Sequence, residues 1–298
     1  MKLYIAKLDR DRIGGGWSFQ DNFAKGLLDY PDDLELTNSY DEADVYFITS
    51  PSMVQRDEVK KAKDDGKKIV LRIDNAVRNS RNRNTGMSRM KDFAEWADLI
   101  VFQSHWAKEY LDEFLDVARD HKTAVILNGV DITLFKPPML DAPANHVLYS
   151  RFNRDETKNF EVARYWYSRF ASDPRNRDSA NLYIVGQFSQ ELRDGNFDFY
   201  NGETYRYLRV LDKQRMADLY KQCGKFLYTY FNDACSNTLI EALCSGCEIV
   251  GDSYYQKTGG AAEIIAVFDK AESIDKARKF FSIERMVLEY KQAIKELA

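Results

Sequence analysis

Long hydrophobic runs are missing from this sequence of 298 residues. No apolar stretch approaches the roughly 20 residues that a helix needs to span a bilayer. The first residues, Met1 to Ile5, read as a short strand and lack the regions of a signal peptide. We therefore expect no transmembrane segment and a cytoplasmic location, which would be the host cytoplasm if the protein were viral.

Histidine and cysteine are scarce, with 3 and 4 residues respectively. All the cysteines lie between residues 223 and 247, and Cys244 and Cys247 form a Cys-x-x-Cys pair. A zinc or redox site of this kind needs a second pair or a thioredoxin-like context, and the sequence has neither. We expect small buried residues at a helix–strand turn instead. The sequence predicts no metal site.

An excess of charge of either sign is also missing. The chain has 43 basic and 47 acidic residues, a formal net charge of −4. This balance argues against a protein that coats nucleic acid along its whole surface, although a local basic patch stays compatible with it. With 44% hydrophobic and 30% charged residues, the composition is typical of a globular protein.

Short apolar strands alternate with amphipathic helices along the chain, which predicts two α/β halves with parallel sheets. The strands are expected at residues 3–6, 45–48, 68–73, 97–104, 123–127, 146–149, 182–185, 207–211, 225–230 and 249–251. Pro137, Pro138 and Pro143 indicate a linker between the halves. We expect domains at residues 1–138 and 139–282.

A glycine run, Gly14 to Gly16, follows the first expected strand and opens a helix expected from Trp17 to about Leu28. Strand, glycine-rich loop and helix are the order of a nucleotide-binding α/β domain. The dinucleotide fingerprint would need a further glycine at Phe19, so that class is excluded. Glycine at this place lets a ligand approach the backbone closely.

The stretch from Asp233 to Gly251 predicts a loop, a helix, a tight turn and a buried strand. Leu239, Ile240 and Leu243 form an apolar stripe at helical spacing, and Gly246 ends the helix.

Two carboxylates flank the start of this helix. Asp233 lies just before it, and Glu241 lies more than a turn inside it. Ser236 or Asn237 can cap the first turn, whose free N–H groups are suited to binding phosphate. An ordinary helix with two surface acids is the alternative interpretation.

Acid, seven residues, Glu-Ala, a glycine turn and a hydrophobic strand together resemble the Glu-x7-Glu motif of retaining GT-B glycosyltransferases. This large group, glycosyltransferase family four, includes sucrose synthase and bacterial mannosyl- and glucosyltransferases. Asp233 stands where the family usually has Glu, and Ala234-Cys235-Ser236 replaces its usual Gly-Phe-Gly. The string from Asn128 to Asp131, followed by Phe135-Lys-Pro, also resembles the family at the end of its first domain.

The resemblance implies the GT-B architecture, an α/β fold in which two Rossmann-like domains with parallel sheets face each other across a cleft. The last helix, about residues 283–298, would pack back on the first domain. The implied reaction moves a hexose or pentose from a nucleotide-diphosphate-sugar, such as a UDP-sugar or GDP-sugar, to a hydroxyl with retained configuration. Neither a metal nor another cofactor is implied.

The resemblance also implies the residues of a donor site. The backbone amides of Ser236, Asn237 and Thr238 would hold the diphosphate, Glu241 would accept hydrogen bonds from the ribose, and Asp233 would hold the donor sugar. The other implied donor-binding residues are Gly15, Gly16, Arg151, Lys158, Gly186 and Leu211. Arg154 competes with Arg151, because Arg151 and Lys158 lie further apart than the corresponding pair of the family.

The acceptor side is expected after the strand at 68–73. Asp74 would orient the acceptor or steady positive charge on the transferred sugar, with Asn75 beside it. A turn role for Asp74 is the alternative. Residues 76–91 contain five cations and no acid, among them Arg78, Arg81 and Arg83. We interpret the segment as a loop that either is solvated or binds an anionic acceptor such as a phosphorylated lipid, an acidic glycan or nucleic acid.

The candidate catalytic residues are Asp74, Asp233 and Glu241. None is expected to be a nucleophile, because in this family the leaving phosphate is thought to take the proton of the acceptor. Three functions stay open. The first is transfer to a glycan or a lipid-linked glycan. The second is modification of a hydroxylated DNA base, as some phage enzymes of this fold perform. The third is epimerisation or non-catalytic binding of a nucleotide-sugar.

Overall fold

The computed structural model describes residues 1–9, 14–74, 83–115, 121–139, 145–152, 158–187 and 204–297, without the side chains of 83–87, 113, 114, 151 and 152. The chain divides into two compact units. Unit 1 holds Met1–Asp131, Asp233–Asn237 and Lys279–Ala298, and unit 2 holds Ile132–Asn232 and Thr238–Arg278.

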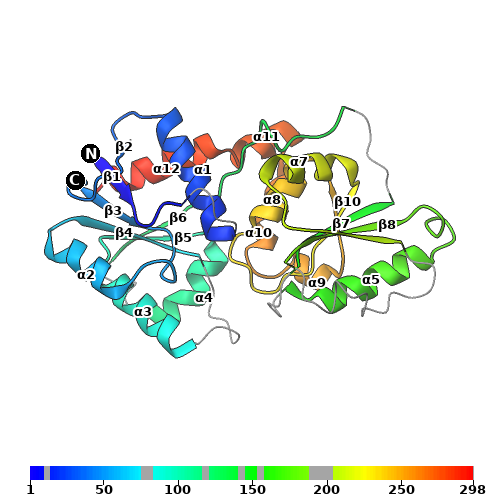
Figure 1. The fold of residues 1–298 in the computed structure, drawn as a ribbon, viewed down its shortest axis with the longest axis horizontal. Helices are drawn as coiled ribbons and strands as arrows, with labels where there is room; N and C mark the ends of the chain where they lie inside the picture. The colour runs from blue at the N-terminus through cyan, green and yellow to red at the C-terminus, as the bar shows by residue number, and fades with distance from the viewer. Residues whose placement is uncertain are drawn as a thin grey trace. The chain divides into compact units, whose positions relative to one another are not determined.

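Unit 1 is built on a six-stranded parallel sheet with the strand order β2-β1-β3-β4-β5-β6. Its elements are β1 (Lys2–Ile5), α1 (Gly15–Asp29), β2 (Glu35–Leu36), β3 (Val45–Ile48), α2 (Arg56–Asp64), β4 (Lys68–Ile73), α3 (Arg83–Trp96), β5 (Leu99–Phe102), α4 (His105–Leu115), β6 (Lys122–Val125) and α12 (Ile283–Lys295). Helices lie on both faces of this sheet (Figure 1), as its continuous apolar strands require.

The C-terminal helix α12 belongs to the core of unit 1. Its buried side chains recur every three or four residues, so they form one apolar stripe. The ring of Tyr290 lies 4.8 Å from Phe23 and 5.6 Å from Phe47, measured between centroids. Figure 1 shows α12 beside α1, and contacts join the two helices. A segment distant in sequence thus completes the first hydrophobic core.

Unit 2 is built on a five-stranded parallel sheet with the order β11-β10-β7-β8-β9. Its elements are β7 (His146–Phe152), α5 (Phe160–Ser172), β8 (Asn181–Gly186), β9 (Tyr205–Leu208), α7 (Lys213–Gln222), β10 (Lys225–Leu227), most of α8 (Asn237–Cys244), β11 (Glu248–Val250), α9 (Ser253–Gln256), α10 (Ala261–Lys270) and most of α11 (Ile274–Phe280). The two doubly wound sheets match the fold class expected from the sequence.

Two local expectations are wrong. The basic segment at 76–91 is not a loop throughout, because α3 begins at Arg83 and Arg89 donates to the carbonyl of Val54 at 3.4 Å. The strand expected at 207–211 is β9, which ends at Leu208. The carboxylate of Asp212 accepts a hydrogen bond from Arg215 N at 2.8 Å, so the next residues form the first turn of α7.

Gly26 sits where α1 and α12 touch, and a methyl group there would collide with α12. An ideal Cβ at Gly26 would lie only 2.7 Å from Ile283 Cγ2 and would also overlap Val287 Cγ2. Alanine normally stabilises a helix by about 1 kcal/mol relative to glycine. We expect Gly26→Ala to lower the free energy of unfolding by about 1–3 kcal/mol instead, because the core is overpacked.

Chemical denaturation of the Gly26→Ala variant measures this change. Leu28→Ala is the matched control, because Leu28 lies on the same helix and is 54% exposed. An increase in stability for Gly26→Ala would contradict the packing of α12 on α1.

Candidate functional site

The second sheet changes its direction of winding between β7 and β10. From β7 the chain adds β8 and β9 on one side, and β10 and β11 lie on the other. Ligands of open α/β sheets bind beyond the carboxyl ends of the strands at such a switch point. The chain carries Lys158 after β7, and Thr229 and Tyr230 after β10. The strand order alone therefore marks these residues as a candidate ligand site in unit 2.

Contacts in unit 2 hold Lys158 at this place. Its backbone carbonyl accepts hydrogen bonds from Tyr149 Oη at 2.9 Å and from Thr229 Oγ1 at 2.8 Å. Its side chain is 5% exposed, and Nζ lies 4.0 Å from the centroid of the Tyr230 ring. An ammonium over an aromatic face is stabilised by the ring quadrupole. The structure thus keeps a fixed, buried cation at the end of β7.

Helix α8 follows β10 and carries the second acid of the sequence motif. Glu241 is 9% exposed, and its Oε2 lies 3.3 Å from Tyr220 Oη, which also lies 3.1 Å from the carbonyl of Thr238. A surface acid, the alternative that the sequence allowed, is thereby excluded for Glu241. Ser236, Asn237 and Thr238 at the start of α8 are also buried. A buried carboxylate held by a tyrosine hydroxyl is a fixed acceptor for ligand hydroxyls.

Unit 1 brings together two of the predicted residues at the carboxyl ends of its strands. An ideal Cβ at Gly16, in the first turn of α1, would lie 3.7 Å from Asp74 Oδ2, 3.1 Å from Met53 Sδ and 4.0 Å from Thr49 Cγ2. Gly14, which precedes α1, has a φ of +149°, a conformation that side chains rarely adopt. The glycine run therefore places backbone close to the carboxylate that follows β4, which leaves Asp74 half-buried.

Comparison with solved structures matches the whole chain. HepE from Anabaena, solved in complex with UDP-glucose, is 14% identical, with a TM-score of 0.70 over 99% of this chain and 100% of that chain. Sucrose-phosphate synthase from Thermosynechococcus elongatus is 14% identical, with a TM-score of 0.67 over 99% and 98%. AviGT4, a glycosyltransferase involved in avilamycin A biosynthesis, is 13% identical, with a TM-score of 0.63 over 99% and 98%.

The chain has the GT-B fold. The sequence matches no protein-family model and no curated protein sequence. The similarity to known proteins is therefore a similarity of backbone fold. The GT-B fold does not by itself determine which ligands the protein binds, so the ligands must be inferred from the residues of the site.

The remaining predicted residues divide into two groups. Asn75, Arg78, Arg81 and Arg154 lie outside the described residues, and Arg83 and Arg151 lie in α3 and β7 without described side chains. Gly15 begins α1, Asp233 is half-buried on the way to α8, and Gly186 ends β8 with a φ of +153°. Leu211, which we expected at the end of a strand, lies instead beyond β9, directly before the residue that caps α7.

Sequence reasoning missed one buried cation of this GT-B chain. Arg72 lies inside β4 and is 1% exposed, with its guanidinium carbon 3.8 Å from the centroid of the Phe19 ring. It donates to the carbonyl of Thr49 at 3.0 Å, to Gln103 Oε1 at 2.6 Å and to Asn128 Oδ1 at 3.1 Å. Burial lowers the pKa of Arg72, while the charge of nearby Asp74 opposes that shift. One charged residue among the apolar residues 69–73 was the available signal.

The cysteines are small buried residues, as the sequence predicts. None of the four forms a disulfide, and all are buried. Burial raises the pKa of Cys235, Cys244 and Cys247 to about 12. Among the described residues, no cluster of three or more histidine, cysteine, aspartate or glutamate side chains could hold a metal ion.

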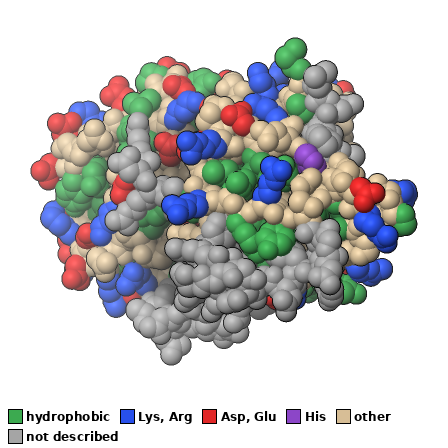
Figure 2. Space-filling view, turned by 45° about the vertical axis from the view of Figure 1, so that its right-hand side comes forward, with side chains coloured by type: hydrophobic (Ala, Val, Ile, Leu, Met, Phe, Trp, Pro, Cys, Tyr) green, Lys and Arg blue, Asp and Glu red, His purple; other side chains and the backbone are tan. Residues whose placement is uncertain are grey.

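Basic and acidic side chains are interspersed on the face that Figure 2 draws. Exposed ion pairs at helical spacing are common, such as Lys60 with Asp64 at 2.6 Å, and each contributes no more than about 1 kcal/mol. No helix within the described part of the chain is both long and apolar enough to cross a membrane.

Thiol labelling tests the buried state of the cysteines. The thiolate is the reactive form, and a raised pKa together with burial keeps the thiols protonated and shielded at pH 8. We expect a thiol reagent such as DTNB to label none of the four native cysteines within minutes, and all four after unfolding in guanidinium. Ser179→Cys, at an exposed position, is the control for a reactive thiol. Rapid labelling of Cys244 or Cys247 in the native protein would contradict the structure.

Proposed function

We propose that this protein transfers a sugar from a nucleotide-diphosphate-sugar to a hydroxyl acceptor with retention of the anomeric configuration. The observation that carries the proposal is the fixed arrangement around α8. The first turn of α8 contains buried polar residues, and the buried carboxylate of Glu241 follows them in the same helix. A buried cation, Lys158, lies at the switch point of the sheet of unit 2. Similarity in fold to HepE and sucrose-phosphate synthase supports the same reading.

The residues have distinct roles in the proposed donor site. The amides of Ser236, Asn237 and Thr238 bind the diphosphate, because unpaired N–H groups at a helix start attract anions. Lys158 neutralises charge that develops on the leaving diphosphate. Glu241 accepts hydrogen bonds from the ribose hydroxyls.

The proposed donor site has further contacts. Asp233 binds hydroxyls of the donor sugar, and Arg151, Gly15, Gly16, Gly186 and Leu211 complete the site. We propose a UDP-sugar as donor, because UDP and UDP-glucose occupy the HepE structures.

The proposed reaction needs no protein nucleophile and no metal. The bond between the anomeric carbon and the diphosphate oxygen breaks, and a bond from that carbon to the acceptor oxygen forms on the same face. The acceptor proton passes to an oxygen of the leaving phosphate. Asp74 steadies positive charge on the sugar or orients the acceptor, and its place beside Gly16 at the carboxyl ends of the strands supports this role.

For the acceptor we propose a glycan or a lipid-linked glycan. The chain has 43 basic and 47 acidic residues, so no overall positive charge favours a polyanionic acceptor over a neutral or weakly charged one. The basic residues Arg78 and Arg81 lie outside the described residues. Transfer to a hydroxylated base in DNA is the competing outcome. It would fall steeply as salt is raised, whereas transfer to a neutral glycan would change little.

Calorimetry with UDP tests the donor site. We expect Lys158→Ala and Glu241→Ala each to weaken UDP binding about tenfold or more, because each removes a hydrogen bond to a charged or hydroxyl group. Glu241→Ala should still fold, since Tyr220 Oη keeps the carbonyl of Thr238 as an acceptor.

Lys276→Ala and Glu272→Ala are the matched controls. These two residues form an ion pair with side chains 62% and 80% exposed, and their loss should leave UDP affinity unchanged. If both site variants bind UDP like the unmodified protein, the donor site is misplaced. Inversion of the anomeric configuration in the product, read by NMR, would overturn the retaining mechanism. Release of an epimerised nucleotide-sugar without acceptor would reassign the reaction.

A further inference from the structure

A chain of hydrogen bonds leads from the buried Arg72 to the start of α8, entirely within unit 1. Arg72 donates to Asn128 Oδ1, and Asn128 Nδ2 lies 2.8 Å from Asn237 Oδ1. Gln103 flanks the chain, with Oε1 accepting from Arg72 and Nε2 donating to the carbonyl of Ile73 at 2.9 Å. All four side chains are at most 3% exposed.

The chemistry of Arg72 fixes the direction of every bond in this chain. A guanidinium can only donate, so the atom of Asn128 that faces it must be the oxygen. The Asn128 nitrogen then faces three acceptors: Gln103 Oε1 at 3.0 Å, the carbonyl of Cys235 at 3.1 Å and Asn237 Oδ1. The oxygen of Asn237 is thereby fixed as the acceptor, and its nitrogen must point away. The orientation of an amide at the start of α8 thus depends on a cation inside β4.

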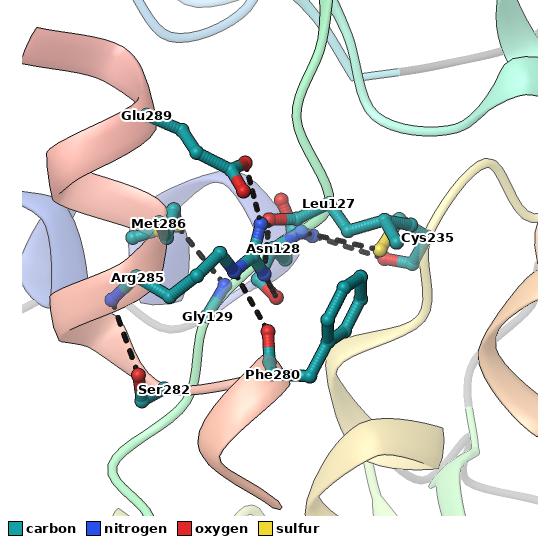
Figure 3. Close-up of polar contacts among 9 residues, drawn as sticks. All are labelled: Leu127, Asn128, Gly129, Cys235, Phe280, Ser282, Arg285, Met286 and Glu289. Carbon is teal, nitrogen blue, oxygen red and sulfur yellow. Dashed lines mark hydrogen bonds and ion pairs between the residues drawn. The ribbon is translucent and has the colours of Figure 1, made fainter. Parts of the chain in front are cut away.

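The backbone around Asn128 is held from the side of α12. Figure 3 shows Asn128 between α12 and the segment that carries Cys235. Arg285 on α12 donates to the carbonyl of Leu127 at 3.0 Å and to that of Asn128 at 3.3 Å. Gly129 N lies 3.0 Å from Met286 Sδ. With its backbone fixed and its side chain oriented by Arg72, Asn128 presents its N–H groups in one arrangement.

The chain of hydrogen bonds ends at the side-chain amide of Asn237, whose N–H groups are not used within it. Asn237 is the first residue of α8 and is 3% exposed, and its oxygen is occupied by Asn128. No described residue accepts a hydrogen bond from Asn237 Nδ2. Asn237 Nδ2 is not among the buried polar atoms that lack a partner, so a ligand or water can reach this nitrogen and accept a hydrogen bond from it. The helix start and this oriented amide are two independent features that both suit an anionic oxygen.

We propose that Asn237 Nδ2 donates to a diphosphate oxygen of the donor nucleotide, and that Arg72 and Asn128 are positioning residues that set its orientation. This inference rests on the proposed function, because it assigns the ligand of the same site. It adds a side-chain hydrogen bond to the contacts that the backbone amides make with the diphosphate. Whether the Asn237 amide turns its nitrogen or its oxygen toward the diphosphate then depends on Arg72. The competing explanation is that Asn128 is only a tether, which holds the segment before α8 in place through its hydrogen bond to the carbonyl of Cys235.

Two substitutions at Asn237 separate binding from folding. Asn237→Ala removes the donor, and Asn128 Nδ2 keeps Gln103 and the Cys235 carbonyl as acceptors. Asn237→Asp keeps the acceptor for Asn128 and turns a negative oxygen toward the ligand. A carboxylate in the first turn of a helix is favourable, so we expect Asn237→Asp to be at least as stable as the unmodified protein in thermal unfolding.

Binding of UDP and of uridine, which lacks the phosphates, gives the readout. We expect Asn237→Ala to weaken UDP binding about tenfold and Asn237→Asp to weaken it further, with uridine binding unchanged in both. Asn176→Asp is the control. It removes an amide that donates to the carbonyl of Phe170. Asn176 lies beyond the C-terminal end of α5, whereas Lys158 precedes that helix, so the change should leave UDP binding unchanged. A purely structural role for Asn237 would lower stability and affinity together and would affect uridine as well.

A double-mutant cycle tests the role of Asn128. Asn128→Asp cannot donate, so the Asn237 amide rotates to donate to it and turns its oxygen toward the phosphate. We expect Asn128→Asp alone to weaken UDP binding about tenfold, and to have little further effect in the Asn237→Ala background. Equal losses in both backgrounds would support the tether and overturn the positioning role. If Asn128→Asp does not fold, the Asn237 variants alone decide whether the amide binds phosphate.

The two proposals fail in different ways. Absence of UDP binding, and of binding to other nucleoside diphosphates, by the unmodified protein would remove the proposed function itself. Normal UDP binding by Asn237→Ala, with the unmodified protein also binding, would overturn only the role of the Asn237 side chain.

Discussion

The burial of one cation, Arg72, constrains much of unit 1. A guanidinium removed from water needs acceptors for its N–H groups, since a buried charge without them is strongly unfavourable. In this protein the acceptors come from three different segments, after β3, β5 and β6: the carbonyl of Thr49, Gln103 and Asn128. Arg72 thereby ties the carboxyl ends of neighbouring strands together. The same bonds decide which way each amide points.

The strand order explains why polar residues gather where they do. In both sheets the first strand of the unit lies in the interior of the sheet, and later strands are added on either side of it. The carboxyl ends beside that strand are the switch points at which α/β proteins bind ligands. In unit 1, Gly16 follows β1, and Asp74 follows β4, which β3 separates from β1. In unit 2, Lys158 follows β7 and Tyr230 follows β10. Each of the two sheets therefore has polar residues at the carboxyl ends of its strands, where a ligand could bind.

Much of the fold was predictable, because it depends on local patterns. The apolar run at 68–73 is β4 with the expected bounds, and the stretch from Asp233 onward forms the expected helix and strand. The α3 helix was missed because basic and polar residues at 83–91 hide its start, and its apolar contacts come later in the segment. The domain bounds and the roles of the candidate site residues stay predictions.

Other features depended on partners distant in sequence. The role of Arg72 could not be read from its neighbours, since its acceptors come from residues 49, 103 and 128. The sequence could not distinguish a buried Glu241 from one on the surface, because both fit the same helical pattern. Only the approach of Tyr220 from α7 distinguishes the two cases. A pattern along the chain predicts elements well, but it does not show which side chain from another element will meet a polar group.

The place of α12 has a consequence for synthesis in the cell. Unit 1 begins at Met1, yet Tyr290, Val287 and Met286 form part of its first core. Domains commonly fold one after another while the ribosome is still translating. Here the aromatic surface formed by Phe23 and Phe47 must wait for about 240 further residues before Tyr290 emerges to cover it. We therefore expect this apolar surface to stay uncovered during translation until α12 has been synthesised, and a chaperone that binds apolar surface to shield it in that interval.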